Sequence, residues 1–355
     1  MSHHLHNLSH RTNRRAAVQG ALGLAASITF AGRFTPGVLA QDPTSVSLAL
    51  DWYPNANHAG LYLAQDRGYF EGANLALDIY TPADPAAALQ TVGAGRDTFG
   101  ISYHSEILFA REQEVPVVSV AALVQHPLNC LMMLADSDIE TPSDLVGRVV
   151  GTAGLPSDDA YLQTMLEEDG ASIDDVEVVN VGFDLLPAVL SGRADAVIGS
   201  YWTHETILAE RQGSPVRYLR VEEWGVPDYY ELIVAAGEDT IAEQGDAISV
   251  FLGALQQGYT DAIADPDAAL EVLLAASPDL DAGVEREGLE LLMPLWTSDG
   301  DVTFGTQTEE RWDAFGSWMK EQRLLAEDVE IAAAWNGDLL PVSDASATPG
   351  ATPAS

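Results

Sequence analysis

The stretch LDWYPNANHAGLYLAQDRGYF, residues 50–70, contains the junction that decides the fold. An alternating strand pattern over residues 45–51 ends at Trp52, and a helical spacing of apolar residues begins at His58. Small polar residues usually form such turns, yet residues 52–58 include two aromatic rings, two amides and an imidazole. We therefore predict a strand-to-helix junction whose side chains contact a ligand.

Strand and helix patterns alternate along most of the chain. The strand patterns cover residues 75–80, 98–102, 117–123, 128–134, 148–154, 176–181, 194–200, 216–219 and 229–236. The helical patterns cover residues 58–69, 85–92, 105–112, 158–168, 185–190 and 202–211, and the region 238–325 is helical almost throughout. This alternation predicts an α/β fold of βαβ units, with parallel sheets covered by helices on both faces.

Two apolar strands, near residues 128–134 and 229–236, divide the alternation into two α/β lobes. We expect the chain to cross between the lobes at these points, which creates a hinge and a ligand cleft. In open α/β sheets, ligands bind beyond the carboxyl ends of the strands, where residues 52–58 lie. The predicted domains are an export signal at 1–40, the first part of lobe 1 at 44–127, lobe 2 at 128–232, the mostly helical return to lobe 1 at 233–340, and a disordered Ala/Thr/Pro/Ser tail at 341–355.

The amino-terminal residues have the pattern of a twin-arginine export signal. Arg14 and Arg15 precede an alanine-rich apolar stretch, and residues 38–40 (Val-Leu-Ala) form a small-residue cleavage site. The apolar stretch is too short to span a bilayer, so a membrane anchor is the less favoured alternative. The single cysteine, Cys130, is far from this site and cannot carry a lipid there. We expect a protein exported to the periplasmic or extracellular face.

The composition is strongly acidic, with 54 Asp and Glu against 16 Lys and Arg and a formal net charge of −38. Such a surface repels nucleic acids and anionic membranes, so we expect neither as a partner. The single cysteine excludes an internal disulfide. The sequence contains no G-x-S-x-G elbow, phosphate-binding loop or spaced Cys/His set, and we predict no metal or cofactor site. The export signal and the hinged two-lobe pattern favour a binding protein over an enzyme.

The candidate ligand-binding residues gather at the ends of predicted strands and at the two crossovers. Aromatic rings stack on flat heteroaromatic ligands, while amides and carboxylates bind the polar edges of such rings. The predicted residues are Trp52, Tyr53, Asn55, Asn57, His58, Tyr103, His104, Gln125, Ser157, Asp158, Tyr201, Glu205 and Tyr229.

Several of these residues have a structural alternative. Asn57 and Ser157 also suit the N-cap position of a helix, and a lone histidine such as His104 is more often structural. Tyr201 and Glu205 are four residues apart and would share one face of a helix, where a ring beside a carboxylate suits an aminopyrimidine. The alternative for Glu205 is a solvated residue in the first helical turn, where the helix dipole favours negative charge.

The motif D-W-x-P-N-x-N-H-x-G at residues 51–60 resembles the opening of the thiamine-pyrimidine-precursor binding proteins of ABC importers. The segments FGISYHSEI (99–107), VQHPLNCLMM (124–133), LVGRVVGTAG (145–154) and GSYWTHE (199–205) follow in the order of that family. The resemblance covers roughly residues 45–325. It implies the two-lobed, type II periplasmic-binding-protein fold of the thiamine-biosynthesis-like family, and it implies the same Tyr201 and Glu205 pair.

The resemblance also implies a function. We expect a monomeric solute-binding protein whose ligand is an aminopyrimidine precursor of thiamine, of the formylaminopyrimidine or hydroxymethylpyrimidine type, and whose partners are an ABC permease and its ATPase. Riboflavin is the alternative ligand. An alternative of another class is a pyrimidine-synthesis enzyme that consumes its own histidine and bound pyridoxal phosphate, but its cysteine-rich signature is missing here. Sulfonates and nitrate favour Arg or Lys, and no predicted site residue is either.

Overall fold

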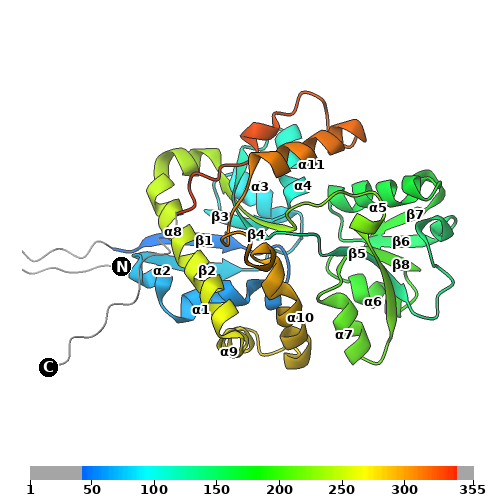
Figure 1. Ribbon diagram of the computed structural model, residues 1–355, viewed down its shortest axis with the longest axis horizontal. Helices are drawn as coiled ribbons and strands as arrows, with labels where there is room; N and C mark the ends of the chain where they lie inside the picture. Colours follow the sequence, from blue (N-terminus) through cyan, green and yellow to red (C-terminus); the bar gives the residue numbers. More distant parts are fainter. Residues whose placement is uncertain (1–41, 342–355) are drawn as a thin grey trace, which may run out of the picture. The chain divides into compact units, whose positions relative to one another are not determined.

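The computed structural model describes residues 42–341, which contain two five-stranded sheets flanked by helices (Figure 1). The first sheet has the order β2-β1-β3-β10-β4 and consists of β1 (Thr44–Ala49), β2 (Leu75–Tyr80), β3 (Phe99–Ser102), β4 (Val117–Val124) and β10 (Leu232–Gly237). The second sheet has the order β7-β6-β8-β5-β9 and consists of β5 (Asn129–Leu134), β6 (Val149–Thr152), β7 (Glu177–Asn180), β8 (Ala196–Tyr201) and β9 (Val216–Arg220). We call the units built on these sheets lobe 1 and lobe 2.

Helices follow most of the strands, as the alternating pattern predicts. Those of lobe 1 are η1 (Ala56–His58), α1 (Ala59–Asp66), α2 (Tyr69–Gly72), α3 (Ala87–Gly93), α4 (His104–Glu112), α8 (Glu238–Ala264), α9 (Pro266–Ala276), α10 (Ala282–Leu295), η5 (Ser298–Gly300), α11 (Glu309–Glu321) and η6 (Ile331–Ala333). Those of lobe 2 are η2 (Pro142–Leu145), α5 (Pro156–Glu168), η3 (Ile173–Asp175), α6 (Leu185–Leu190), α7 (Glu205–Arg211) and η4 (Val221–Glu223). The predicted export signal at 1–40 and residues 342–355 of the predicted tail lie outside the described residues.

The sheets are mixed, so the prediction of wholly parallel sheets was wrong. Pairs within each run of βαβ units are parallel, as in β1 with β2 and β6 with β7. The two strands that follow a crossing between lobes run the other way: β5 is antiparallel to β8 and β9, and β10 to β3 and β4. The reason is geometric. A chain that arrives from the other lobe enters the sheet on the side that faces that lobe, where the parallel strands end (Figure 1).

Close packing of α1 on α8 holds the junction that follows β1. A methyl group added at Gly258 would lie 2.3 Å from the Gly60 carbonyl oxygen, so the two helices approach closely only because these positions are glycines. The neighbouring Tyr259 is fully buried, and its hydroxyl donates to the Asn57 carbonyl at 2.6 Å. The long carboxyl-terminal helix α8 therefore fixes the turn that carries the candidate residues.

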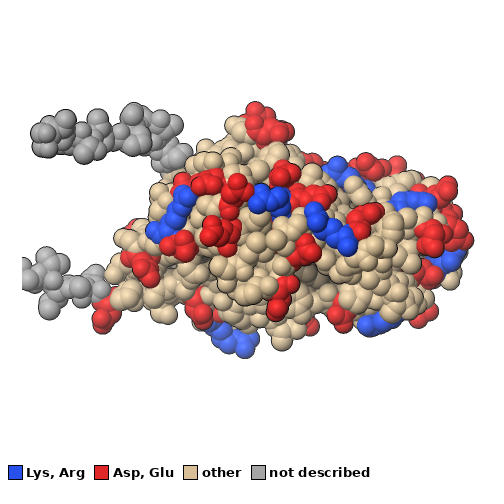
Figure 2. All heavy atoms as spheres, turned by 90° about the horizontal axis from the view of Figure 1, so that it is seen from below, with Lys and Arg blue, Asp and Glu red and all other residues tan. Residues whose placement is uncertain are grey.

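The surface is acidic, in keeping with the composition. Figure 2 shows Asp and Glu side chains over most of the face it draws, with fewer Lys and Arg side chains between them. Across residues 42–341, no helix combines the length and the apolar composition needed to cross a bilayer.

Candidate ligand-binding site

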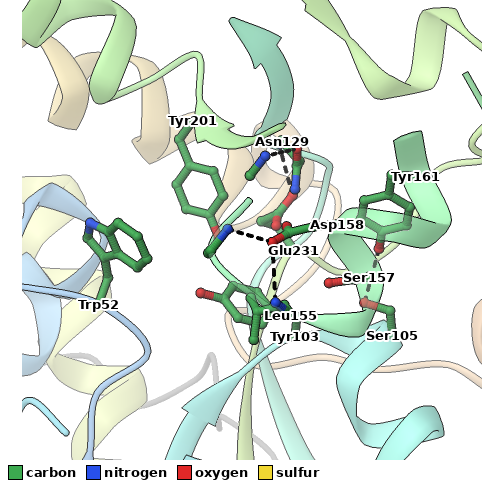
Figure 3. Close-up of a pocket in the computed structure, with 12 residues that line it drawn as sticks. Trp52, Tyr103, Ser105, Asn129, Leu155, Ser157, Asp158, Tyr161, Tyr201 and Glu231 are labelled. Carbon is green, nitrogen blue, oxygen red and sulfur yellow. Dashed lines mark hydrogen bonds between the residues drawn. The ribbon is translucent and has the colours of Figure 1, made fainter. Parts of the chain in front are cut away.

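A small polar cavity lies between the lobes, where strand ends from both sheets meet (Figure 3). Strands β1, β3 and β8 end next to it, while β5 and β10 begin beside it. Its free volume is about 10 Å³, room for about one water molecule, so a ring-sized ligand needs the lobes to lie further apart. The lining residues are Trp52, Tyr103, Ser105, Asn129, Ala153, Leu155, Ser157, Asp158, Tyr161, Gly199, Tyr201 and Glu231. We call this space the inner cavity.

Aromatic rings from both lobes border the inner cavity. Trp52 comes from lobe 1 and is half-buried, and Tyr201 is the last residue of β8 in lobe 2. Figure 3 shows the two rings on opposite sides of an open space, with Tyr103 close to Tyr201. The Tyr103 hydroxyl donates to Oδ2 of Asp51 at 3.3 Å. A flat ligand between Trp52 and Tyr201 would stack against aromatic faces.

Asp158 has one buried carboxylate oxygen to spare. It is 1% exposed, and its Oδ2 accepts from the backbone N–H groups of Ala153 (2.8 Å) and Leu155 (3.3 Å) at the start of α5. Its Oδ1 has no hydrogen-bond partner among the described residues. The buried hydroxyl of Tyr201 also has no hydrogen-bond partner among the described residues. It lies close enough to Glu231 to favour the charged form of the Glu231 carboxyl group. Unsatisfied buried polar atoms are costly and mark a place where a ligand can bind.

Carboxyl groups dominate the electrostatics of the inner cavity. Burial raises the pKa of Glu106 and of Glu231 to about 7, and burial together with the charge of Glu106 raises the pKa of Asp158 well above its ordinary value. Burial and the charges of the surrounding acids, Asp51 first among them, also raise the pKa of Tyr103. The lining contains no Lys, Arg or His among the described residues. This environment favours ligands that donate hydrogen bonds or carry positive charge and disfavours anions.

Two hydrogen bonds between helices of different lobes narrow the inner cavity. The backbone N–H of Ser157 in α5 donates to Oε1 of Glu106 in α4 at 3.0 Å. The Tyr161 hydroxyl in α5 donates to Oγ of Ser105 in α4 at 3.1 Å. Because these bonds join α4 to α5, they must break when the lobes separate.

The polar residues after Trp52 build the turn rather than line the inner cavity. Asn55 is the N-cap of η1, because its side chain accepts from the Asn57 N–H at 2.9 Å; the true N-cap therefore lies two residues before the predicted Asn57. Nδ1 of His58 accepts from the Asn55 N–H at 3.2 Å, and its Nε2 lies 2.9 Å from Oδ1 of Asp51. All three predicted residues are buried within the junction, and their role is to hold Trp52 in place.

Three further predicted residues also lie outside the inner cavity. His104 is buried against Trp312, with ring centroids 3.9 Å apart, and burial lowers its pKa well below the ordinary value, which matches the structural alternative. The Gln125 side chain, at the first crossover, donates to the Thr306 carbonyl at 3.2 Å. The Tyr229 hydroxyl donates to Oε2 of Glu231 at 2.8 Å, so Tyr229 supports a lining residue.

Glu205 differs from both sequence interpretations. Helix α7 begins at Glu205 and Tyr201 still belongs to β8, so the two do not share a helix face. Glu205 is only 7% exposed, which overturns the alternative of a solvated first-turn residue. Its Oε2 accepts from the Tyr201 N–H at 2.9 Å, and its Oε1 lies 3.1 Å from Nδ1 of His204. Ser157 likewise is not an N-cap, because α5 begins one residue earlier with Leu155 at the N-cap position.

A larger groove of about 690 Å³ lies on the other side of Trp52. We call it the outer groove; its lining includes Tyr53, Phe183, Leu186, Leu208, Val284, Glu205 and Glu285. Phe183 comes from the loop between β7 and α6, and its ring centroid lies 4.6 Å from that of Trp52 and 4.7 Å from that of Tyr53. Of these three rings, Trp52 lines both the outer groove and the inner cavity, while Tyr53 and Phe183 line the outer groove alone.

Sequence reasoning missed Asn129, Glu231 and Phe183. Asn129 and Glu231 are polar residues at the edges of apolar strand patterns, and this is a signal that the sequence shows. The prediction considers mainly the carboxyl ends of strands, whereas these two residues lie where strands begin. Phe183 lies in a loop whose sequence gives no sign of its contact with Trp52.

The fold matches those of solved solute-binding proteins. The alkanesulfonate-binding protein SsuA of Xanthomonas axonopodis, bound to MOPS, superposes with a TM-score of 0.68 at 17% identity, over 84% of this chain and all of that one. At this identity the match establishes the fold alone. It confirms the expected two-lobed periplasmic-binding-protein architecture.

Sequence comparison identifies the family. The formylaminopyrimidine-binding protein of Halalkalibacterium halodurans is 38% identical, over 80% of this chain and 88% of that protein. The riboflavin-binding protein RibY of Chloroflexus aurantiacus is 26% identical over 83% of this chain and 86% of that protein. A family model described as NMT1/THI5 like matches residues 55–269, which include most of both sheets. This chain, with its two lobes and its acid-lined inner cavity, belongs to the NMT1/THI5-like family.

Proposed function

We propose that this chain is an exported substrate-binding protein of an ABC importer and that it binds an aminopyrimidine precursor of thiamine. The observation that carries the proposal is the free Oδ1 of Asp158 in a cavity bordered by Trp52 and Tyr201. An aminopyrimidine offers what this site lacks: a flat ring to stack and an exocyclic amine to donate. The similarity to a formylaminopyrimidine-binding protein supports the same ligand class.

The binding mechanism we propose is closure of the lobes on the ring. The ligand enters while the lobes are apart and stacks on Trp52 of lobe 1. Closure then brings Tyr201 against the other face and Asp158 to the amine, and the contacts of α5 with α4 re-form. The permease recognises the closed form. The twin-arginine pattern, which lies outside the described residues, supports delivery to the cell exterior.

Riboflavin is the second candidate ligand, because a specific observation favours it. The outer groove of about 690 Å³ adjoins Trp52 and could hold a ring system too large for the inner cavity. A relative at 26% identity is named for this ligand. The inner cavity, whose acidic residues are Asp158 and Glu231, would then receive only one edge of the flavin.

An enzymatic function is the weaker proposal. A relative in Legionella pneumophila, 25% identical over 83% of this chain, is named 4-amino-5-hydroxymethyl-2-methylpyrimidine phosphate synthase. The phosphate of such a product would meet the carboxyl-lined cavity unfavourably. We expect the purified protein to form no pyrimidine from pyridoxal phosphate, and we expect mass spectrometry to show that all its histidines stay intact. Formation of a pyrimidine together with loss of one histidine would overturn the proposed binding function.

Titration calorimetry of the mature protein tests the ligand directly. We expect formylaminopyrimidine to bind with one site per chain and an alkanesulfonate to give no heat. If the protein binds riboflavin and not the pyrimidine, the fold and the binding cleft stay as proposed and only the ligand changes. Tight binding of the sulfonate would contradict the role assigned to the acids of the inner cavity.

A further inference from the structure

His204 lies between two buried carboxylates that come from different lobes. Its Nδ1 is 3.1 Å from Oε1 of Glu205 in lobe 2, and its Nε2 is 3.4 Å from Oε1 of Glu285 in α10 of lobe 1. The His204 side chain is 16% exposed, that of Glu205 9% and that of Glu285 1%. This three-residue bridge is separate from the inner cavity, whose lining contains none of the three.

Each carboxylate of the bridge also holds a backbone N–H group near a ring of the ligand site. Oε2 of Glu285 accepts from the Ala56 N–H at 2.7 Å, in the turn that follows Trp52. Oε2 of Glu205 accepts from the N–H of Tyr201 itself at 2.9 Å. A continuous chain of polar contacts therefore runs from the Trp52 turn in lobe 1 to Tyr201 in lobe 2.

Close packing of α10 supports this arrangement. A methyl group added at Gly288 would lie 2.8 Å from the Thr203 carbonyl oxygen and 3.5 Å from the Ala56 side chain. Helix α10 therefore touches both turns that the bridge connects, and it does so one helical turn after Glu285.

The charge state of His204 suits a bridge. Burial lowers the pKa of this imidazole, but the charges and hydrogen bonds of Glu205 and Glu285 outweigh burial and raise it to about 10. At neutral pH both ring nitrogens then carry protons: Nδ1 donates to Glu205, and Nε2 forms an ion pair with Glu285. Without this cation two buried carboxylates would face each other unpaired, which is strongly unfavourable.

We propose that His204 is a positioning residue for the ligand site: its two N–H groups set the separation of the Trp52 and Tyr201 turns without touching the ligand. The inference rests on the proposed function only in placing the ligand between Trp52 and Tyr201. It assigns the bridge to the closed arrangement, because His204 and Glu285 belong to different lobes and part when the lobes separate.

The test compares His204→Gln with Glu287→Gln. Glu287 is the matched control, because it also lies on α10 and reaches α7 through Arg211 (3.4 Å), but at the exposed surface. We expect His204→Gln to bind formylaminopyrimidine about 10- to 100-fold more weakly, the usual effect of losing a hydrogen bond between charged groups, and Glu287→Gln to bind within about twofold of the parent. Unchanged affinity in His204→Gln would overturn the proposal.

A ligand-free measurement separates this inference from the proposed function. Amide hydrogen exchange at Tyr201 reports the half of the bridge that stays within lobe 2 when the lobes separate, and we expect this amide to exchange faster in His204→Gln and not in the control. Should the parent ignore aminopyrimidines, the exchange result still decides the inference. If His204→Gln does not fold, Glu285→Gln, which keeps an acceptor for the Ala56 N–H, takes its place in the calorimetry; parent-like affinity for formylaminopyrimidine would then refute the bridge.

Discussion

Asp158 in the inner cavity and Glu205 in the outer groove are both buried carboxylates near Tyr201, yet they differ in what they can offer a ligand. Asp158 keeps one oxygen without a partner, and its pKa is raised by burial and by Glu106. Both oxygens of Glu205 have partners; burial acts to raise its pKa, but His204 more than compensates and lowers it. This difference is why we propose that the ligand binds at the unused acceptor of Asp158 rather than in the larger outer groove.

The largest expected effect is that of removing Trp52, the aromatic residue that lines both the inner cavity and the outer groove. Trp52→Ala removes stacking and buried area together, and we expect it to weaken aminopyrimidine binding by about 2–4 kcal/mol, the range of a binding hot spot. Trp335→Ala is the control, because this half-buried tryptophan of lobe 1 packs on Trp312 and lines neither region. Titration calorimetry measures both variants. Equal affinities for the two variants would remove Trp52 from the site.

The pH dependence of stability should distinguish the inner cavity from an ordinary surface. Glu106 and Glu231 have folded-state pKa values of about 7, above the value of 4.5 for a free glutamate. The folded chain therefore binds more protons than the unfolded chain between these pH values. Stability is fully present below pH 4.5 and falls as the pH rises through 7, by on the order of 3 kcal/mol at most for each group.

Thermal melts at pH 5 and pH 7.5 check this sign. We expect the parent to melt at a lower temperature at pH 7.5, and Glu231→Gln to lose part of that difference. Glu290→Gln, at an exposed position of α10, should keep the parent's difference. If Glu231→Gln keeps the parent's full difference in melting temperature between pH 5 and pH 7.5, the pKa of Glu231 is not raised by folding.

The two carboxylates themselves give the most direct test. Asp158→Asn should weaken aminopyrimidine binding by about 1–3 kcal/mol, because an NH2 group that cannot accept from the amine replaces one carboxyl oxygen. Glu205→Gln should lower the melting temperature more than Asp158→Asn does, because it leaves the buried His204 cation with one carboxylate fewer. Calorimetry and a thermal melt of each variant separate ligand contact from structural support. A larger affinity loss in Glu205→Gln than in Asp158→Asn would indicate that the exocyclic amine of the ligand binds Glu205, as the sequence pattern and the family resemblance predict.

How much the sequence could predict follows from how far apart the interacting residues lie in the chain. Periodicity locates the strand ends and the helix starts, so the sequence predicts Trp52, Tyr103, Ser157, Asp158 and Tyr201 as site residues, and all five line the inner cavity. The sequence could not reveal pairs such as His204 with Glu285, because their contact depends on how α10 packs across the cleft. It could not reveal the direction of β5 and β10 either, since periodicity carries no information about parallel or antiparallel pairing.

The smallest expected effect belongs to Tyr53, and it tests the comparison of the two regions most sharply. Tyr53 is 54% exposed, lines the outer groove but not the inner cavity, and contacts Phe183 across the lobes. For a single pyrimidine ring in the inner cavity, Tyr53→Ala removes the ring contacts with Phe183 and Trp52 but no ligand contact, and we expect a loss of about 0.5–1 kcal/mol. A flavin that extends into the outer groove would stack near Tyr53, and its affinity would fall by about 2 kcal/mol or more, as for a hot-spot residue. Calorimetry of Tyr53→Ala with each ligand decides between the two. A large loss of aminopyrimidine affinity would place the pyrimidine in the outer groove and withdraw the role assigned to Asp158.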